Sequence, residues 1–305
     1  MNLKRLEYTL TTKCNSQCLH CQAEASPQKN EVMEVEDACN YLEEATSVAK
    51  LESFMVFGGE PMLYPDRAIA IFQKASELKI PVIEMLTNGV WGKSIKDAEK
   101  LAIELENAGL NDVGVSVDAF HLQHIPLEYP RNAALALVKA GVKKVNWNVT
   151  VVESINATNE YDRKTKQILE TLKPVGIETH IHKVMPVGRA TKNLRQYFQK
   201  MPLNGSCEGD VILGNVLTNP TSICVEPSGE VDVCWHLPIG NAKEKALSKI
   251  ISEYDWRKNS TIKVLVEKGP LGLLERMEKG KDKLMMDKYI GRCHLCIEIR
   301  KILNA

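Results

Sequence analysis

Three cysteines near the start of the chain have a spacing that suits a metal centre. Cys14, Cys18 and Cys21 form a Cys-x3-Cys-x2-Cys pattern directly after the strand-like run Leu6–Thr11. A loop at the end of a strand can wrap three thiolates around one iron–sulfur cluster, because such clusters take soft sulfur ligands. Three protein ligands leave one iron of a [4Fe–4S] cluster open. The pattern therefore predicts a cluster that binds a substrate or cosubstrate directly.

Two other interpretations of this pattern stay open on spacing alone. A structural zinc site needs a fourth ligand, which within this loop only His20 offers. The three cysteines would otherwise be small apolar side chains packed in a core. The cluster is favoured over zinc because the loop has three thiols and no fourth. It is favoured over core packing because grouped cysteines in a reducing compartment are typical of metal or cluster ligands.

A second group of thiols lies more than 180 residues further along the chain. Cys224 and Cys234 flank a turn signal at residues 227–229, so we expect them on either side of a hairpin. Cys293 and Cys296 form a Cys-x2-Cys pair, which we expect in a short loop. Together the four thiols make a tetrahedral set that suits either a [4Fe–4S] cluster or zinc.

Two cysteines remain outside these groups. Cys39 lies in a helical stretch and is expected to pack as a small apolar side chain. Cys207 lies in a loop-like segment and has three possible roles. It replaces Cys224 as a ligand, donates a hydrogen atom to a substrate radical, or is an incidental loop residue.

The elements that must position these residues are six strand-like runs that alternate with helix-like stretches of three- and four-residue apolar spacing. The runs are Leu6–Thr11, Ser53–Phe57, Val82–Leu86, Val113–Val117, Val145–Val152 and Thr179–Val184. Six strand–helix units in series predict an α/β fold, a partial (βα)6 TIM-like barrel over residues 1–200, with function at the carboxyl ends of the strands. Residues 201–305 predict a small α+β cysteine-rich domain.

The composition excludes several classes of function. The chain has 305 residues, 44% of them hydrophobic, and 39 basic residues balance 39 acidic ones. No net field favours nucleic acid or an anionic membrane, so neither is an expected partner. The first residues lack the apolar stretch of a signal peptide, and no apolar run is long enough to span a membrane. We therefore expect a cytoplasmic protein.

Further polar and glycine residues stand at the ends of the predicted strands, in the order in which a barrel mouth would gather them. They are Gly58, Gly59, Glu60 and Pro61 after the second run, Asn88 after the third, Ser116 and Asp118 at the fourth, Asn148 in the fifth, and Gly188 after the sixth. Together with the cysteine spacing, these motifs resemble the radical S-adenosylmethionine (SAM) superfamily.

The resemblance implies roles for these residues. The strand-end residues would bind SAM, and His20 would lie near its adenine. In this family a reduced [4Fe–4S] cluster cleaves SAM to a 5′-deoxyadenosyl radical, which abstracts hydrogen from the substrate. An oxygen-sensitive enzyme and a flavodoxin- or ferredoxin-type electron donor are implied as well.

The C-terminal thiols resemble the Twitch or SPASM-like domains of the same superfamily. Gly229 and Cys234 fit the G-x4-C element of these domains. The resemblance implies one auxiliary [4Fe–4S] cluster, held by Cys224, Cys234, Cys293 and Cys296, with zinc as the alternative.

The reaction is less specified than the cofactor. The segments Thr87–Gly92 and Ser116–His121 resemble those of enzymes that modify peptides, so a peptide or protein is the expected substrate. Asp118, His121 and Cys207 are the candidate catalytic residues. The alternatives are a dehydrogenase or lyase of a small metabolite and, from another class, a non-catalytic iron–sulfur or zinc regulator.

Overall fold

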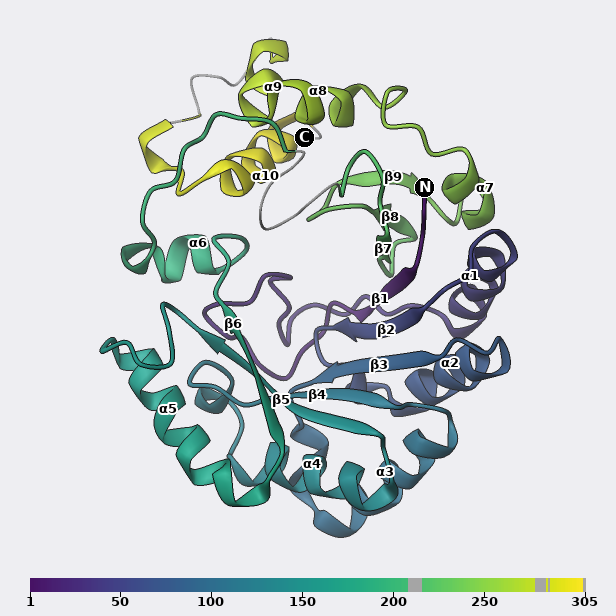
Figure 1. Cartoon of the computed structure of the whole chain (residues 1–305), viewed down its shortest axis with the longest axis vertical. Helices are drawn as coiled ribbons and strands as arrows, with labels where there is room; N and C mark the ends of the chain where they lie inside the picture. The colour runs from purple at the N-terminus through teal and green to yellow at the C-terminus, as the bar shows by residue number, and fades with distance from the viewer. Residues whose placement is uncertain (208–215, 278–283, 285, 304–305) are drawn as a thin grey trace.

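The computed structural model describes residues 1–207, 216–277, 284 and 286–303. A nine-stranded sheet forms its centre, with the strand order β6-β5-β4-β3-β2-β1-β7-β8-β9 (Figure 1). The first six strands are parallel. They are β1 (Arg5–Thr11), β2 (Ser53–Gly58), β3 (Val82–Thr87), β4 (Asp112–Ser116), β5 (Lys144–Val151) and β6 (Glu178–Lys183).

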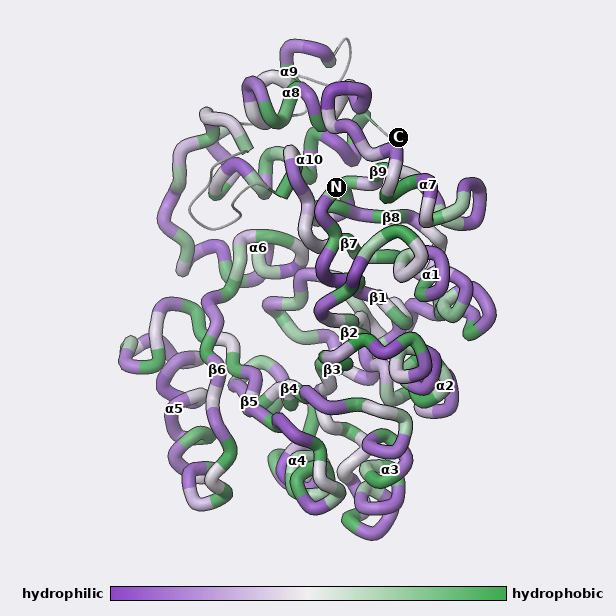
Figure 2. Tube along the Cα trace, turned by 45° about the vertical axis from the view of Figure 1, so that its right-hand side comes forward, coloured by the Kyte–Doolittle hydropathy of each residue, from purple (hydrophilic) through white to green (hydrophobic). Residues whose placement is uncertain are grey.

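Five helices connect these strands in the predicted alternation. They are α1 (Val35–Val48), α2 (Pro65–Glu77), α3 (Ile95–Asn107), α4 (Glu128–Ala140) and α5 (Glu160–Leu172). Figure 1 shows them along one face of the curved sheet, and in Figure 2 hydrophilic and hydrophobic residues alternate along α3 and α5. The predicted partial (βα)6 barrel is confirmed, and each predicted strand agrees with an observed one to within one residue at each end.

Strand β1 shows how the two faces of the sheet differ. Leu6, Tyr8 and Leu10 are fully buried and face the helices, where the Tyr8 hydroxyl donates to the Ala38 carbonyl of α1 at 2.9 Å. The alternate residues Arg5, Glu7 and Thr9 point to the opposite, concave face, because successive side chains of a strand alternate between its faces. On β1 this concave face is therefore polar, up to the carboxyl end of the strand.

The C-terminal segment continues the same sheet across the predicted domain boundary near residue 200. Strand β7 (Ser222–Val225) pairs in parallel with β1, and β8 (Glu230–Asp232) and β9 (Pro238–Asn241) follow in antiparallel order. The predicted hairpin is therefore present. Its strands extend the barrel sheet, and so a division at residue 200 stays a prediction.

Short helices complete the C-terminal part of the chain. They are α6 (Ala190–Asn193), α7 (Leu247–Ser252), α8 (Ser260–Lys268), α9 (Pro270–Arg276) and α10 (Arg292–Leu303). Helix α7 packs on α1. Within the described residues, no helix is both long and apolar enough to cross a bilayer.

The loop that follows β1 is held against the end of β2 by glycines that admit no side chain. A Cβ built on Gly59 would lie 1.9 Å from the Lys13 carbonyl oxygen, and one on Gly58 would lie 2.6 Å from the Thr11 carbonyl oxygen. Both neighbours are backbone atoms, so they cannot move aside as a flexible side chain would. The end of β2 and the cysteine-bearing loop therefore depend on each other for their positions.

We predict that Gly59→Ala lowers the free energy of unfolding by about 3 kcal/mol, because the added methyl group overpacks two backbone segments. Gly176→Ala is the matched control: its φ is +76° but nothing lies within 4 Å of its Cβ position. Backbone strain alone should cost it about 1 kcal/mol. Denaturant unfolding of both variants checks this, and equal losses would contradict the steric explanation.

Candidate functional site

The structure gathers Cys14, Cys18 and Cys21 in the loop at the carboxyl end of β1. Cys14 and Cys18 are 8% and 6% exposed, and Cys21 is half-buried. Burial raises the pKa of Cys14 to about 11, and the negative charge of a Cys21 thiolate contributes to this rise. The sulfur of Cys14 accepts hydrogen bonds from the Ser16 backbone N–H at 3.4 Å and from Asn88 Nδ2 at 3.7 Å. Such donors stabilise a thiolate, which is the form that binds iron.

A second segment, after β6, holds the far side of this cysteine loop. The Arg189 side chain donates to the Cys18 carbonyl at 2.9 Å and to the Ala25 carbonyl at 2.8 Å. Gly188 has φ +57°, and a Cβ there would lie 2.6 Å from the Cys21 carbonyl oxygen. The sequence identified Gly188 but not Arg189, because an arginine in a loop carries no local signal that it will bond distant backbone carbonyls.

The Gly58–Pro61 motif makes its contacts within the protein. The Gly59 N–H donates to the Thr11 carbonyl at 2.7 Å, and the Glu60 N–H donates to the Lys13 carbonyl at 2.9 Å. Pro61 begins a single turn of 3-10 helix. The motif thus fixes the position of the cysteine loop, and its predicted contact with SAM stays a prediction.

Glu60 is a fully buried carboxylate that joins the ends of β2 and β3. It accepts hydrogen bonds from the Met62 N–H at 3.0 Å, the Thr87 hydroxyl at 2.7 Å and the Asn88 N–H at 2.7 Å. Burial raises its pKa from the ordinary value of 4.5 to about 7, and these three donors limit the rise. Its carboxylate therefore gives the Asn88 backbone a fixed place beside the cysteines.

Asp118, His121 and His20 lie together beside the cysteine loop. Asp118 Oδ1 accepts from the N–H groups of Phe120 and His121 and lies 2.9 Å from His121 Nδ1. Burial would raise the pKa of Asp118, but His121 and the N–H donors outweigh this and lower it to about 2. The ring of His20 lies 4.7 Å from that of Phe120, and burial lowers the pKa of His20 to about 4. A neutral, flat ring thus faces the site.

The remaining predicted SAM contacts lie on strands β4 and β5. Ser116 is 7% exposed and pairs in register with Asn148, which in turn pairs with His180 of β6. The parallel register places these three residues in one row across the sheet. They lie on the same concave face as Glu7 and Thr9, at the carboxyl end of β4. The structure therefore brings the predicted strand-end residues to one edge of the sheet.

A second group of four thiols forms in the C-terminal part, with a different membership from the one expected. Cys207, Cys234, Cys293 and Cys296 line one pocket. Burial raises the pKa of Cys207 to about 12, and thiolates at Cys296, Cys293 and Cys234 each raise it further. The Cys293–Cys296 pair lies in the first turns of α10 and not in a loop.

The expected ligand Cys224 lies outside this pocket, so the four thiols expected from the sequence are not gathered in one place. Its sulfur lies 3.6 Å from Thr9 Oγ1 and 3.8 Å from Glu226 Oε1, on the concave face of the sheet. The reason is the register: Cys224 pairs with Glu7 of β1, so its side chain follows that of Glu7. Cys234 lies beyond the end of β8, where the chain has left the sheet.

Arg300 is a buried cation beside the four thiols. It is 7% exposed, and its Nε donates to Cys296 Sγ at 3.3 Å. Its terminal nitrogens donate to the carbonyls of Trp235 and His236. A guanidinium here offsets the charge of thiolates that would otherwise be buried without compensation.

The buried carboxylate of Glu60 predicts a pH dependence of stability. Its folded-state pKa is raised to about 7, so the fold favours the protonated form. The stability that Glu60 contributes is fully present below pH 4.5, which is its pKa in the unfolded chain. This contribution is lost as the pH rises through about 7, its pKa in the folded protein. Relative to Glu60→Gln, the wild-type protein should lose about 3 kcal/mol over this range.

Unfolding of the cluster-free protein by urea at a series of pH values measures this difference. Glu84→Gln is the control, since Glu84 is a carboxylate on neighbouring β3 that is paired with Arg5. Parallel pH profiles for the wild-type and Glu60→Gln proteins would contradict the prediction.

Comparisons with known proteins agree with this geometry. The family model that describes the Radical SAM superfamily matches residues 8–192. A probable GTP 3′,8-cyclase of Methanothermobacter marburgensis is 25% identical over 264 residues, which cover 76% of this chain and 84% of that protein. A probable GTP 3′,8-cyclase of Methanocaldococcus jannaschii is 29% identical over 119 residues. This match covers 39% of this chain and only 38% of that relative's length.

A similar fold is found among solved structures. The structure of native anSMEcpe with bound AdoMet and Cp18Cys peptide superposes with a TM-score of 0.56 at 15% identity, over 98% of this chain and 94% of that one. At this identity the likeness concerns the fold alone. With the family profile spanning most of the barrel and ending at residue 192, the chain belongs to the Radical SAM superfamily and is a radical SAM enzyme.

Proposed function

We propose that Cys14, Cys18 and Cys21 hold the [4Fe–4S] cluster and that the strand ends beside them bind SAM. The observation that carries this is the convergence of three thiols on one loop, fixed by Gly59 and Arg189 at the barrel mouth. Three thiolates fit a cluster with one open iron, and no fourth protein ligand is needed. When bound, the cluster and SAM together supply a 5′-deoxyadenosyl radical by one-electron reduction.

The surrounding residues are suited to bind and orient SAM. The neutral His20 ring offers a flat surface for adenine, and its buried Nδ1 has no hydrogen-bond partner among the described residues. Ser116 and Asn148 offer polar groups on the inner face for the ribose and carboxylate. Asp118 is engaged by backbone N–H groups, including that of Thr150 at 3.0 Å, so we assign it a positioning role for His121.

We propose that Cys207, Cys234, Cys293 and Cys296 bind an auxiliary [4Fe–4S] cluster, as in Twitch or SPASM-like domains, with zinc as the alternative. The support is the shared pocket and the buried Arg300, which offsets the charge of an anionic four-thiolate centre. This assignment removes Cys207 from the candidate hydrogen-atom donors. Four protein ligands leave no iron open, so such a cluster would transfer electrons or support the fold.

For the substrate we propose a peptide or protein, modified after hydrogen abstraction at the barrel mouth. The support is the sequence of the strand ends and the full-length likeness of fold to a structure that contains a peptide. A small molecule is the second candidate, because the relatives are named GTP 3′,8-cyclases. A flavodoxin- or ferredoxin-type protein is proposed as the reductant. Membership of an enzyme superfamily leaves the regulator hypothesis without support.

Reductive cleavage of SAM tests the first assignment. Protein reconstituted with iron and sulfide, reduced with dithionite and given SAM should form 5′-deoxyadenosine, measured by chromatography. The triple variant of Cys14, Cys18 and Cys21 to Ala should form none above background, because the open iron is lost. Cys39→Ala is the control and should retain the wild-type yield. No product from wild-type protein with intact clusters would overturn the assignment.

Metal content tests the ligands of the second site. Wild-type protein should contain about eight iron atoms per chain, and Cys207→Ala clearly fewer, because removing one of the four thiolates weakens the retention of the auxiliary cluster. Cys224→Ala is the matched control and should keep about eight. Iron and zinc are measured by elemental analysis. The ligand assignment fails if Cys224→Ala loses iron and Cys207→Ala does not, and stoichiometric zinc would select the alternative metal.

A further inference from the structure

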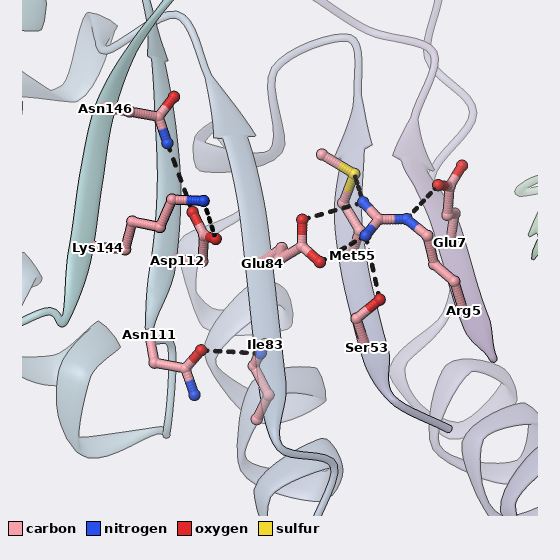
Figure 3. A network of polar contacts seen from close by, with 10 residues as sticks. All are labelled: Arg5, Glu7, Ser53, Met55, Ile83, Glu84, Asn111, Asp112, Lys144 and Asn146. Carbon is pink, nitrogen blue, oxygen red and sulfur yellow. Dashed lines mark hydrogen bonds and ion pairs between the residues drawn. The ribbon is translucent and has the colours of Figure 1, made fainter. Parts of the chain in front are cut away.

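The concave face of the sheet carries a row of one methionine, one cysteine and three acidic residues that crosses five strands. Register pairs align Glu84 of β3, Met55 of β2, Glu7 of β1, Cys224 of β7 and Asp232 of β8. Figure 3 shows the first three of these beside Arg5 on one side of the sheet. The row runs from the barrel into the C-terminal hairpin, because β7 pairs directly with β1.

The hairpin presents this row on its inner face. Val225 and Val231, the alternate residues of β7 and β8, are fully buried in the core. Side chains of opposite parity therefore point to the concave side. Glu226 lies one row nearer the carboxyl end of the sheet, where Thr9 Oγ1 donates to Glu226 Oε1 at 3.1 Å.

The carboxylates at one end of the row are paired with a cation, and those at the other end are not. Arg5 forms ion pairs of 2.5 Å with both Glu7 and Glu84. At the hairpin end, no salt bridge among the described residues involves Glu226 or Asp232. The buried Asp232, the half-buried Glu226 and the half-buried Cys224 thus lie on the concave side without a cation bonded to them in the described part of the chain.

Asp232 shows that this surface is incomplete by itself. The residue is 6% exposed, and its Oδ1 is buried with no hydrogen-bond partner in the described part of the chain. Burial, and then the negative charge of Glu226, raises the pKa of Asp232 to about 8, while Arg300 acts to lower it. The N–H groups of Arg300 donate to Cys296, Trp235 and His236 and not to Asp232. A buried carboxylate oxygen without a donor is costly, and it marks a place where a donor from outside would be favourable.

We propose that Glu226 and Asp232 form a subsite for a positively charged group of the substrate, an alkylammonium or a guanidinium. Such a group would donate to both carboxylates and lie against the Cys224 thiol. The subsite stands at the carboxyl end of β7, the neighbour of β1, whose own carboxyl end leads into the Cys14–Cys21 loop. A substrate held here by its cation therefore has its remaining atoms at the edge where the radical would form.

The inference rests on the proposed function, because it assigns a charge to the substrate of that same site. A metal ion is a poorer occupant: within the described ranges, the ligand atoms that lie mutually close belong to His20, Asp118 and His121, not to the hairpin residues. A nucleoside triphosphate is also a poorer occupant, since its phosphates would meet two carboxylates.

Binding of small probes to the cluster-loaded enzyme tests the subsite. The probes are N-acetyl-lysine amide and N-acetyl-arginine amide, with N-acetyl-norleucine amide, which lacks the terminal charged group of lysine, as the uncharged reference. Calorimetric titration should give a Kd for at least one cationic probe about tenfold lower than for the norleucine probe, as expected for one added charge-assisted contact. Glu226→Gln and Asp232→Asn should each raise that Kd about tenfold.

Glu244→Gln is the matched control, since Glu244 is an exposed carboxylate just beyond β9, and it should leave the Kd within about twofold. Circular dichroism and iron content confirm that each variant is folded and loaded. Equal binding of charged and uncharged probes, or a Kd unchanged in both subsite variants, would overturn the proposal.

Two measurements, probe binding and SAM cleavage, distinguish a failure of the cation subsite from a failure of the proposed function. SAM cleavage without substrate needs the cluster but not the subsite, so formation of 5′-deoxyadenosine by the wild-type protein is measured beside probe binding. Probe binding with no SAM cleavage would reject the proposed cluster site alone. SAM cleavage with no charge-selective probe binding would reject the cation subsite alone.

Discussion

The close contact between the cysteine loop and the strand ends around it is the constraint on which the site depends. Backbone meets backbone at Gly59 and Lys13 and again at Gly188 and Cys21, at separations that a Cβ would prevent. Arg189 adds hydrogen bonds to the carbonyls of the same loop. Three ligands from one short loop can hold a cluster only when the loop is fixed in position by its neighbours.

The pairing of β7 with β1 is the second organising feature. It joins the C-terminal segment to the barrel by main-chain hydrogen bonds, so the barrel strands and the hairpin form one continuous sheet. The same register turns Cys224 and Asp232 toward the concave face and leaves Cys234 beyond the end of β8. One pairing thus decides that Cys224 faces the concave side and stays apart from the thiols that line the C-terminal pocket.

The buried ionisable groups differ in the partners that surround them, and their pKa values differ accordingly. Glu60 and Asp118 are both fully buried, yet the pKa of the first is raised and that of the second is lowered. The difference arises because Asp118 has His121 beside it, whereas Glu60 has only neutral donors. Near the four thiols, Arg300 supplies a positive charge within the protein, while Asp232 has no bonded cation among the described residues.

The sequence by itself determined the barrel and the first site. Alternating apolar runs with glycine at the helix ends predicted all six barrel strands, since these signals are local. The three thiols lie within eight residues, so their spacing alone brought them together. Only the tertiary structure decided the second site. Whether Cys207 or Cys224 joins Cys234 depends on the register between β7 and β1, which are separated by more than 200 residues. No local pattern records such a pairing, and the same holds for Arg189 and for the unpaired carboxylate of Asp232.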